Sequence, residues 1–449
     1  NVQREFTRNF VNRYTFQQIL ADGSYDFLDP ASTPGPLDAL RIATRRPGSY
    51  HLASVNAKVS RFPWQLWAGD VGVPAGVEFR HESQNAGTSP QVLSGTELRP
   101  AINLIDGERN VSAAFVEFSL KPADSVEVQL AGRGDPYDDF GSAFSPKLGV
   151  RWQPSDAWLV RFNASRGFRA PSFPENAQST TISYGTVIDP YDTVQPGGSR
   201  GVTVLRAGNP DLKPERSTNF NLGVLWSPDA DTSLGIDAYR IEQKDLISPD
   251  NIQYVVANPQ LYPGRVTRDA QGRLQLVENQ YANQGTLTTT GFDVEGRKVW
   301  HAGDSAWTLE GTWTRLLSFE QPQVAGEPAI DGAGGNRFGA LPDWRGITTL
   351  GFARGDWDAQ LSWRYIDSYK QQVVTATSNP GLKAKVEASN RFDAYVAYEG
   401  LADTTLYLSV QNLTDRDPPF DPAGGALPYD ITQYDALGRF VTVGVKYRF

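Results

Sequence analysis

The last eleven residues, RFVTVGVKYRF (Arg439–Phe449), alternate between apolar and polar side chains up to the final position. The apolar positions of this terminal strand are Val441, Val443, Val445, Tyr447 and Phe449. A period of two is typical of a strand whose antiparallel sheet has one apolar and one polar face. The segment therefore predicts a strand that continues to the last residue, with Phe449 on the apolar face of the sheet.

The same alternation runs through much of the chain. It is clear in WLVRFNAS (158–165), WTLEGTWT (307–314) and DAQLSWRY (358–365), and in the shorter VEFSL (116–120) and VEVQL (126–130). We count about fifteen such strands, most of them about ten residues or longer, whereas roughly five or six residues is usual in a soluble sheet. A tilted strand that crosses a bilayer needs about 9–11 residues.

Long and short connections alternate between these strands. Going back from the C-terminus, the long loop 415–438 is followed by the tight turn EGLADT (399–404), the long loop 368–390 and the tight turn ARGDW (353–357). The segment 135–145 is a shorter member of the long class. Short turns on one side and long loops on the other are typical of an outer-membrane barrel. A soluble β-sandwich or propeller requires neither this rhythm nor such long strands.

Composition excludes several other classes of protein. The mean hydropathy is −0.42, and no run approaches the roughly 18 apolar residues of a membrane helix. A net charge of −9 argues against nucleic-acid binding. There is no Cys, and His51, His81 and His301 are scattered, so we expect no metal, no cofactor and no catalytic site. The fold class is therefore all-β, an antiparallel transmembrane β-barrel.

The bilayer assigns a direction to each side chain. A charge on the lipid face at the bilayer midplane costs roughly 2–4 kcal/mol, so we expect the polar set of each strand to face the lumen. The predicted lumen-facing charges are Glu117, Glu127, Arg151, Arg161, Asp237, Glu295, Glu310, Arg364 and Lys446. The aromatic residues predicted at the membrane interfaces are Trp152, Trp158, Trp226, Trp357, Tyr398 and Tyr447.

Several proline-rich motifs mark the ends of strands. In FRAPSFPE, Pro171 and Pro174 remove two backbone donors, so the strand must end and a loop begin. In NPDLKPE, Pro210 and Pro214 flank a turn in which we expect Asp211 to bind local backbone. The structural role of these motifs is favoured over ligand contact.

These motifs resemble those of TonB-dependent outer-membrane receptors. The stretches that carry the resemblance, in the family's order, are 144–175 (FSPKLGVRWQPSDAWLVRFNASRGFRAPSFPE), 208–224 (GNPDLKPERSTNFNLGV), 290–296 (TGFDVEG), 341–346 (LPDWRG), 410–419 (VQNLTDRDPP) and the terminal aromatic strand. The resemblance implies a 22-stranded barrel with an N-terminal plug domain, in the outer membrane of a Gram-negative bacterium. It also implies two protein partners, TonB and the assembly machinery that reads the terminal strand, besides the surrounding outer-membrane lipid.

The start of the chain differs from that family pattern. No segment like a plug and no TonB-contacting box precedes the first predicted strand, 51–62, which would be the eighth of the family's 22. We therefore expect a C-terminal fragment, in which residues 1–50 form an extracellular loop region and residues 51–449 form barrel strands. The missing Met and signal peptide agree with this expectation.

Function follows from the resemblance as an expectation. The leading hypothesis is active import of a scarce nutrient, with a small molecule such as an iron-siderophore as the default ligand. The alternatives are a receptor for saccharides and a passive porin with an even strand number; an enzyme ranks last. The loop aromatics considered as ligand contacts, with loop packing favoured for each, are Tyr184, Tyr191, Tyr254, Tyr262, Phe338 and Tyr434.

Overall fold

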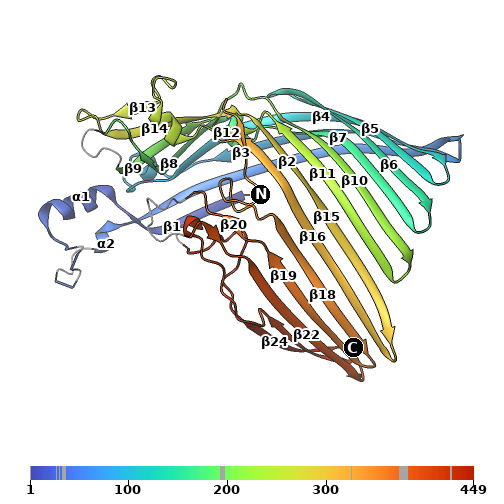
Figure 1. Ribbon diagram of the computed structural model, residues 1–449. Helices are drawn as coiled ribbons and strands as arrows, with labels where there is room; N and C mark the ends of the chain where they lie inside the picture. The colour runs from blue at the N-terminus through green and yellow to red at the C-terminus, as the bar shows by residue number, and fades with distance from the viewer. Residues whose placement is uncertain are drawn as a thin grey trace.

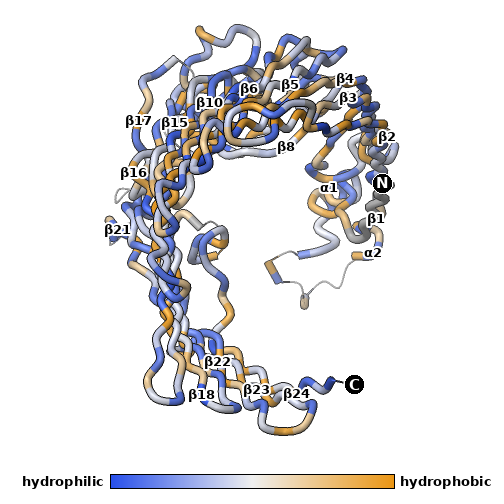
Figure 2. The backbone as a smooth tube through the Cα atoms, turned by 90° about the vertical axis from the view of Figure 1, so that its right-hand side faces the viewer, coloured by the Kyte–Doolittle hydropathy of each residue, from blue (hydrophilic) through white to orange (hydrophobic). Residues whose placement is uncertain are grey.

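Long antiparallel strands form one curved wall in the computed structural model, which describes residues 2–26, 28–29, 31–32, 37–192, 198–324, 326–373, 383–424 and 427–448 (Figures 1 and 2). In these residues fifteen strands follow one another as neighbours. They are β2 (Arg41–Leu66), β3 (Gly69–Ala86), β4 (Ile102–Ala123), β5 (Val126–Tyr137), β6 (Gly141–Ser155), β7 (Trp158–Arg169), β10 (Glu215–Asp229), β11 (Thr232–Lys244), β15 (Thr286–Ala302), β16 (Ser305–Pro322), β18 (Trp344–Arg354), β19 (Trp357–Ile366), β22 (Ser389–Leu401), β23 (Thr404–Gln411) and β24 (Phe440–Tyr447). The predicted strand number is confirmed.

Shorter elements lie before the first wall strand and in the connections between wall strands. They are β1 (Val2–Val11), α1 (Arg13–Asp22), α2 (Leu37–Leu40), α3 (Pro90–Leu93), α4 (Phe173–Asn176), β8 (Gln178–Ile188), β9 (Ser199–Ala207), β12 (Ile247–Pro249), α5 (Ile252–Ala257), β13 (Val266–Arg268), β14 (Leu274–Asn283), β17 (Ala329–Asp331), β20 (Tyr369–Lys370), β21 (Lys385–Val386) and the 3-10 turn Pro422–Gly424. No helix within the described ranges is both long and apolar enough to cross a membrane.

The alternation of short and long connections is confirmed (Figure 1). Each short turn leaves two residues between its strands, as at 156–157 and 230–231. One member of the predicted long class is wrong: β5 and β6 continue pairing as far as Tyr137 and Gly141, so only residues 138–140 connect them. The pairing persists because Gly141 accepts a φ of +109°, which closes the turn.

The first fifty residues contain more regular structure than a loop region. β1 pairs with the first part of β2, from Val2 opposite Ser49 to Val11 opposite Arg41. Asn12 caps the N-terminus of helix α1, because its side chain accepts hydrogen bonds from two backbone N–H groups of the first turn. The first wall strand begins at Arg41, ten residues before the predicted boundary, because this hairpin extends β2. That residues 1–50 are extracellular stays a prediction.

The wall has two chemically different faces, set by the strand period of two. One, the apolar face, carries exposed hydrophobic side chains from every part of the wall, such as Val55 (74% exposed), Phe79, Leu222 and Val443 (77% exposed). Soluble proteins rarely expose apolar patches larger than a few hundred Å². The opposite face, the polar face, carries most of the charged side chains. This arrangement is that of a wall with lipid on one side.

Aromatic pairs mark the short-turn end of the apolar face. Trp158 lies 6.2 Å from Trp226 between ring centroids, and Trp357 lies 4.8 Å from Tyr398. Near the loop end, Trp363 and Tyr365 pack against Trp313 at 5.2 and 5.7 Å. Indole and phenol rings prefer the membrane interfaces, so the two groups mark the edges of the apolar band.

The terminal strand has one neighbour. Val441, Val443 and Val445 of β24 stand opposite Val410, Leu408 and Leu406 of β23. Tyr447 lies on the same apolar face, and Phe449 lies outside the described residues. The wall forms an open arc (Figure 2), and no pairing within the described residues joins β24 to β1 or β2.

Substitution of Val443 tests the assignment of the faces. Val443 lies four residues from Tyr447, near the middle of the band, so Val443→Arg should lower the free energy of unfolding in lipid bilayers by about 2–4 kcal/mol. Thr442→Arg, on the polar face of the same strand, is the control and should cost less than about 1 kcal/mol. Urea titration in vesicles measures both, and equal losses would contradict the assignment.

Candidate functional site

All nine charges predicted to face the lumen lie on the polar face, as the strand registers show. That this face lines a lumen stays a prediction. The structure brings some of the nine together and keeps others apart. Glu127 stands directly opposite Arg151, whereas Glu117 is opposite Ala131 and Lys446 opposite Thr405.

Arg161 and Asp237 form an ion pair across an intervening strand. Arg161 of β7 and Asp237 of β11 both stand opposite Gly223 of β10, and Arg161 Nε donates to Asp237 Oδ1 at 2.9 Å. A Cβ at Gly223 would lie 2.6 Å from Arg161 Nε. Only glycine leaves room for this bridge.

Three further predicted charges lie in polar recesses of the same face. Glu295 and Glu310 line a cavity of ≈ 560 Å³ with Arg297. Arg364 pairs with Asp393 at 2.7 Å.

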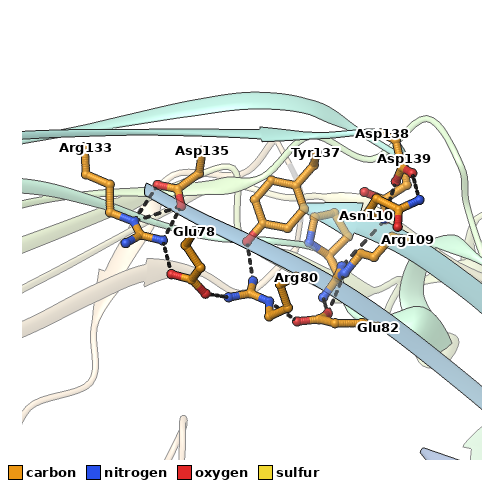
Figure 3. Close-up of polar contacts among 11 residues, drawn as sticks. Glu78, Arg80, Glu82, Arg109, Asn110, Arg133, Asp135, Tyr137, Asp138 and Asp139 are labelled. Carbon is orange, nitrogen blue, oxygen red and sulfur yellow. Dashed lines mark hydrogen bonds and ion pairs between the residues drawn. The ribbon is translucent and has the colours of Figure 1, made fainter. Parts of the chain in front are cut away.

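A continuous ion-pair ladder crosses β3, β4 and β5 on the polar face (Figure 3). Its acidic and basic side chains alternate, with distances of 2.5–3.2 Å between neighbours, in the order Asp135, Arg133, Glu78, Arg80, Glu82 and Arg109. Asp135 and Glu82 are 4% and 7% exposed. Buried carboxylates require such partners, because an uncompensated buried charge is strongly destabilising.

None of the six ladder residues is among the nine charges predicted to face the lumen. The ladder's signal is present in VEFRHE (77–82), where Glu78, Arg80 and Glu82 alternate in sign at every second position. These three residues do not reveal their other partners, because Arg109 and Arg133 lie on the separate strands β4 and β5.

The ladder ends on the first proline motif. Arg109 donates to the Pro171 carbonyl at 2.8 Å and lies over the Phe173 ring at 4.8 Å. β7 ends at Arg169, and Glu175 closes a capping box with Ser172 at the start of α4. The motif shapes the loop, as predicted.

Arg169 joins the two proline motifs. Its guanidinium binds Glu175 of FRAPSFPE at 2.9 Å and Glu215 of LKPER at 2.6 Å. Glu215 is 7% exposed and also accepts from the Ile247 backbone at 2.8 Å. One prediction about the second motif is wrong: Asn209, not Asp211, supplies the acceptor, because its side chain binds the Asp211 N–H at 3.0 Å.

The two longest connections fold together into a loop platform. β9 from the first connection pairs in parallel with β14 from the second, and β8 pairs with β4. The platform has its own small core, which consists of Val187, Val202, Val204, Val255, Val256, Leu274 and Val277. Asp189, fully buried, binds Arg268 at 2.6 and 2.9 Å and so links the same two connections. These loops are therefore held to one another as well as to the wall.

Most of the loop aromatics serve packing. Tyr254 and Tyr262 contact each other at 6.2 Å, and Tyr262 packs on the platform core. Arg99 lies over Tyr184 at 4.5 Å, the Tyr191 hydroxyl donates to the Ala257 carbonyl at 3.3 Å, and Phe338 packs against Phe319 at 6.1 Å.

Tyr434 instead lines a pocket on the polar face at the loop end of the wall. This arginine pocket of ≈ 580 Å³ lies between β16, β18, β19 and β22 and the segment 433–435. Arg345, Arg364 and Arg391 all line it, and Arg364 and Arg391 stand directly opposite each other. Burial raises the pKa of Tyr434 to about 12, so its hydroxyl stays protonated at neutral pH.

The arginine pocket keeps a positive charge. Asp393 neutralises Arg364 and Asp435 pairs with Arg391 at 3.0 Å. Arg345 has no ion pair within the described part of the chain. Guanidinium groups bind anionic oxygens in bidentate geometry, so the pocket suits an anionic ligand. Among the described residues no group of three or more His, Asp or Glu side chains could hold a metal ion.

The Arg169 junction can be tested by hydrogen exchange. Arg169→Gln leaves Glu215 without its cation and should lower the opening free energy of residues 170–176 and 245–249 by about 1–3 kcal/mol. We expect no larger loss, because Arg169 is 44% exposed and solvent screens its ion pairs. Arg166→Gln, on the other face of the same strand, is the control and should leave this protection unchanged. Equal protection in both variants would contradict the junction.

Acidification tests the platform. The Arg268 guanidinium lowers the pKa of Asp189 below its usual 3.8. A lowered pKa in the folded state adds stability that is fully present above about pH 4 and lost as the pH falls through the folded value. Hydrogen exchange of residues 187–192 and 198–204, corrected for intrinsic rates, should show this loss below pH 4. Asp189→Asn should be less protected at neutral pH and should show a smaller acid-dependent loss than the wild type, because only the Asp192–Arg200 pair then remains to titrate in these segments.

Comparison with known proteins places this architecture in a family. A family model described as "TonB dependent receptor-like, beta-barrel" matches residues 1–413. The iron-regulated outer membrane virulence protein of Vibrio cholerae serotype O1 is 31% identical over 173 residues, which are 38% of this chain and 22% of that protein. The probable TonB-dependent siderophore receptor PirA of Acinetobacter baumannii is 25% identical over 228 residues, 50% of this chain and 28% of that protein.

Solved structures share the fold. The crystal structure of the siderophore receptor PirA from Acinetobacter baumannii superposes with a TM-score of 0.62 at 17% identity and covers 100% of this chain and 59% of that one. A ferric enterobactin receptor (PfeA) mutant from Pseudomonas aeruginosa gives a TM-score of 0.62 at 16% identity, covering 99% and 58%. The chain thus spans less than two thirds of these relatives. It belongs to the family of TonB-dependent outer-membrane receptor β-barrels, which are receptors and not enzymes.

Proposed function

We propose that this chain forms part of the wall and loop end of an outer-membrane receptor that binds a ferric siderophore and imports it with energy supplied through TonB. The arginine pocket carries the proposal. Its three guanidinium groups stand at the loop end of the polar face, where a ligand from the medium would arrive. Ferric complexes of catecholate or carboxylate siderophores are anionic, and Arg binds such oxygens well. Several relatives are named as siderophore receptors.

The wall itself disfavours a passive porin made of these strands alone. Such a channel needs an even strand number and a pairing between its first and last strands, because an open edge cannot lie in hydrocarbon. The described wall has fifteen strands, and β24 does not pair with β2. TonB and the assembly machinery remain partners inferred from the family resemblance.

A binding titration tests the ligand class. Two probes would be titrated separately into the receptor that contains this chain: the ferric complex of a catecholate siderophore, and a maltodextrin. Intrinsic tryptophan fluorescence is the readout. The ferric complex should bind, and Arg345→Gln and Arg391→Gln should each weaken it about tenfold, as expected for a loss of about 1.4 kcal/mol. Arg297→Gln, on the same face but nearer the short turns, is the control and should bind normally.

Uptake of radioactive iron by whole cells completes the test. A protonophore should abolish uptake, whereas a passive channel would continue to conduct. Binding of maltodextrin without binding of the ferric complex would replace the proposal by a saccharide receptor. Full affinity in both arginine variants would show that the arginine pocket does not bind the ligand.

A further inference from the structure

The apolar face carries a groove on β4, β5, β6, β7 and β10. Its cavity of ≈ 590 Å³ is lined by large apolar side chains, among them Phe118, Leu130, Leu148 and Phe220. Small residues, Gly132 and Ala164, lie between them. A groove with these walls on a lipid-facing surface suits a hydrocarbon chain.

Cations gather at the loop-side end of this groove, on the three adjacent strands β7, β10 and β11. This basic patch consists of Arg166, Arg216, Arg240 and Lys244, with Glu242 among them. Directly paired residues share a face of the sheet. Arg166 is paired with Thr218, and Arg216 is paired with Phe168 on one side and Lys244 on the other. These positions lie an even number of residues from Trp158 and Trp226, so the patch is on the apolar face. Arg166 and Thr218 also line the groove.

The patch carries more positive charge than its neighbours neutralise. Glu242 pairs with Lys244 at 2.9 Å and with Arg240 at 3.7 Å. Arg166 and Arg216 are exposed and have neither an ion pair nor a side-chain hydrogen bond to any described residue. Four cations and one carboxylate leave three uncompensated positive charges on a face that otherwise meets lipid tails.

The height of the patch matches a lipid headgroup. Arg166 lies eight residues along β7 from Trp158, which marks the short-turn edge of the apolar band. Eight residues span about 26 Å at about 3.3 Å each, or about 20 Å along the membrane normal at a tilt of about 40°. On β19, Tyr365 lies the same number of residues from Trp357 and marks the loop-side edge of the apolar band. The guanidinium of Arg166 can extend from there into the headgroup layer.

From this arrangement we propose that the groove and the basic patch bind one phosphorylated lipid of the leaflet on the side of the long connections. An acyl chain lies in the groove, and the lipid phosphate lies between Arg166 and Arg216. The phosphate supplies the anion that these two side chains lack, and Arg binds phosphate in bidentate geometry. The occupant is a lipid because the apolar groove and the basic patch meet at the boundary of hydrocarbon and headgroup. The inference is independent of the ligand that the receptor transports.

Native mass spectrometry of the receptor, released from mild detergent, tests the proposal. The probes are purified lipid A, phosphatidylglycerol and inorganic phosphate. The wild type should retain lipid A, and the double variant Arg166→Gln/Arg216→Gln should bind it at least tenfold more weakly. Arg354→Gln removes a cation from the same face near the short turns, and it should bind lipid A as the wild type does.

A second pair of variants tests the groove. Ala164→Phe fills it and should also weaken retention of lipid A, whereas Ala359→Phe, on the same face of β19, should not. Lipid retention in a receptor that has lost siderophore binding would leave this proposal standing. Equal retention in the double variant, binding of inorganic phosphate as tight as that of the lipids, or a second protein copy in place of lipid would overturn it.

Discussion

Backbone hydrogen bonding in hydrocarbon is the constraint on which this structure depends. A polypeptide in the bilayer must pair every N–H and C=O group within itself, and a long antiparallel wall does so strand by strand. Because successive side chains of a strand point to opposite faces of its sheet, they alternate between the apolar face and the polar face along each strand. The exposed hydrophobic face from Val55 on β2 to Val443 on β24 is the consequence.

The same alternation concentrates charge on the other face. Side chains there lie roughly 5 Å apart on neighbouring strands, so unlike charges pair and like charges must be separated or neutralised. The ion-pair ladder on β3 to β5 is the fully paired case, with Glu82 and Asp135 nearly buried. The arginine pocket is the unbalanced case, because Arg345 has no carboxylate of its own among the described residues. Where pairing is complete the face is structural, and where it is incomplete a ligand can supply the missing charge.

The loop end is organised by a few polar junctions. Arg169 holds both proline motifs, and the buried Asp189 holds Arg268 from a different connection. In each junction the carboxylate is the more buried partner, so removal of its arginine would leave a buried charge that is costly to the fold. The loop platform thereby presents fixed surfaces to whatever approaches the wall from that side.

Sequence alone determined the fold class, the approximate number of wall strands, all but one of the long and short connections and the face on which each of the nine predicted charges lies. It could do so because a period of two and the length of a membrane strand are local properties, readable in segments such as Arg439–Phe449. Tertiary structure alone decided that Arg161 reaches Asp237 over Gly223, that two loops share a core, and that Arg345, Arg364 and Arg391 meet. These contacts join residues tens of positions apart in the chain, and strand register and the shape of the connections, rather than any local pattern, bring them together.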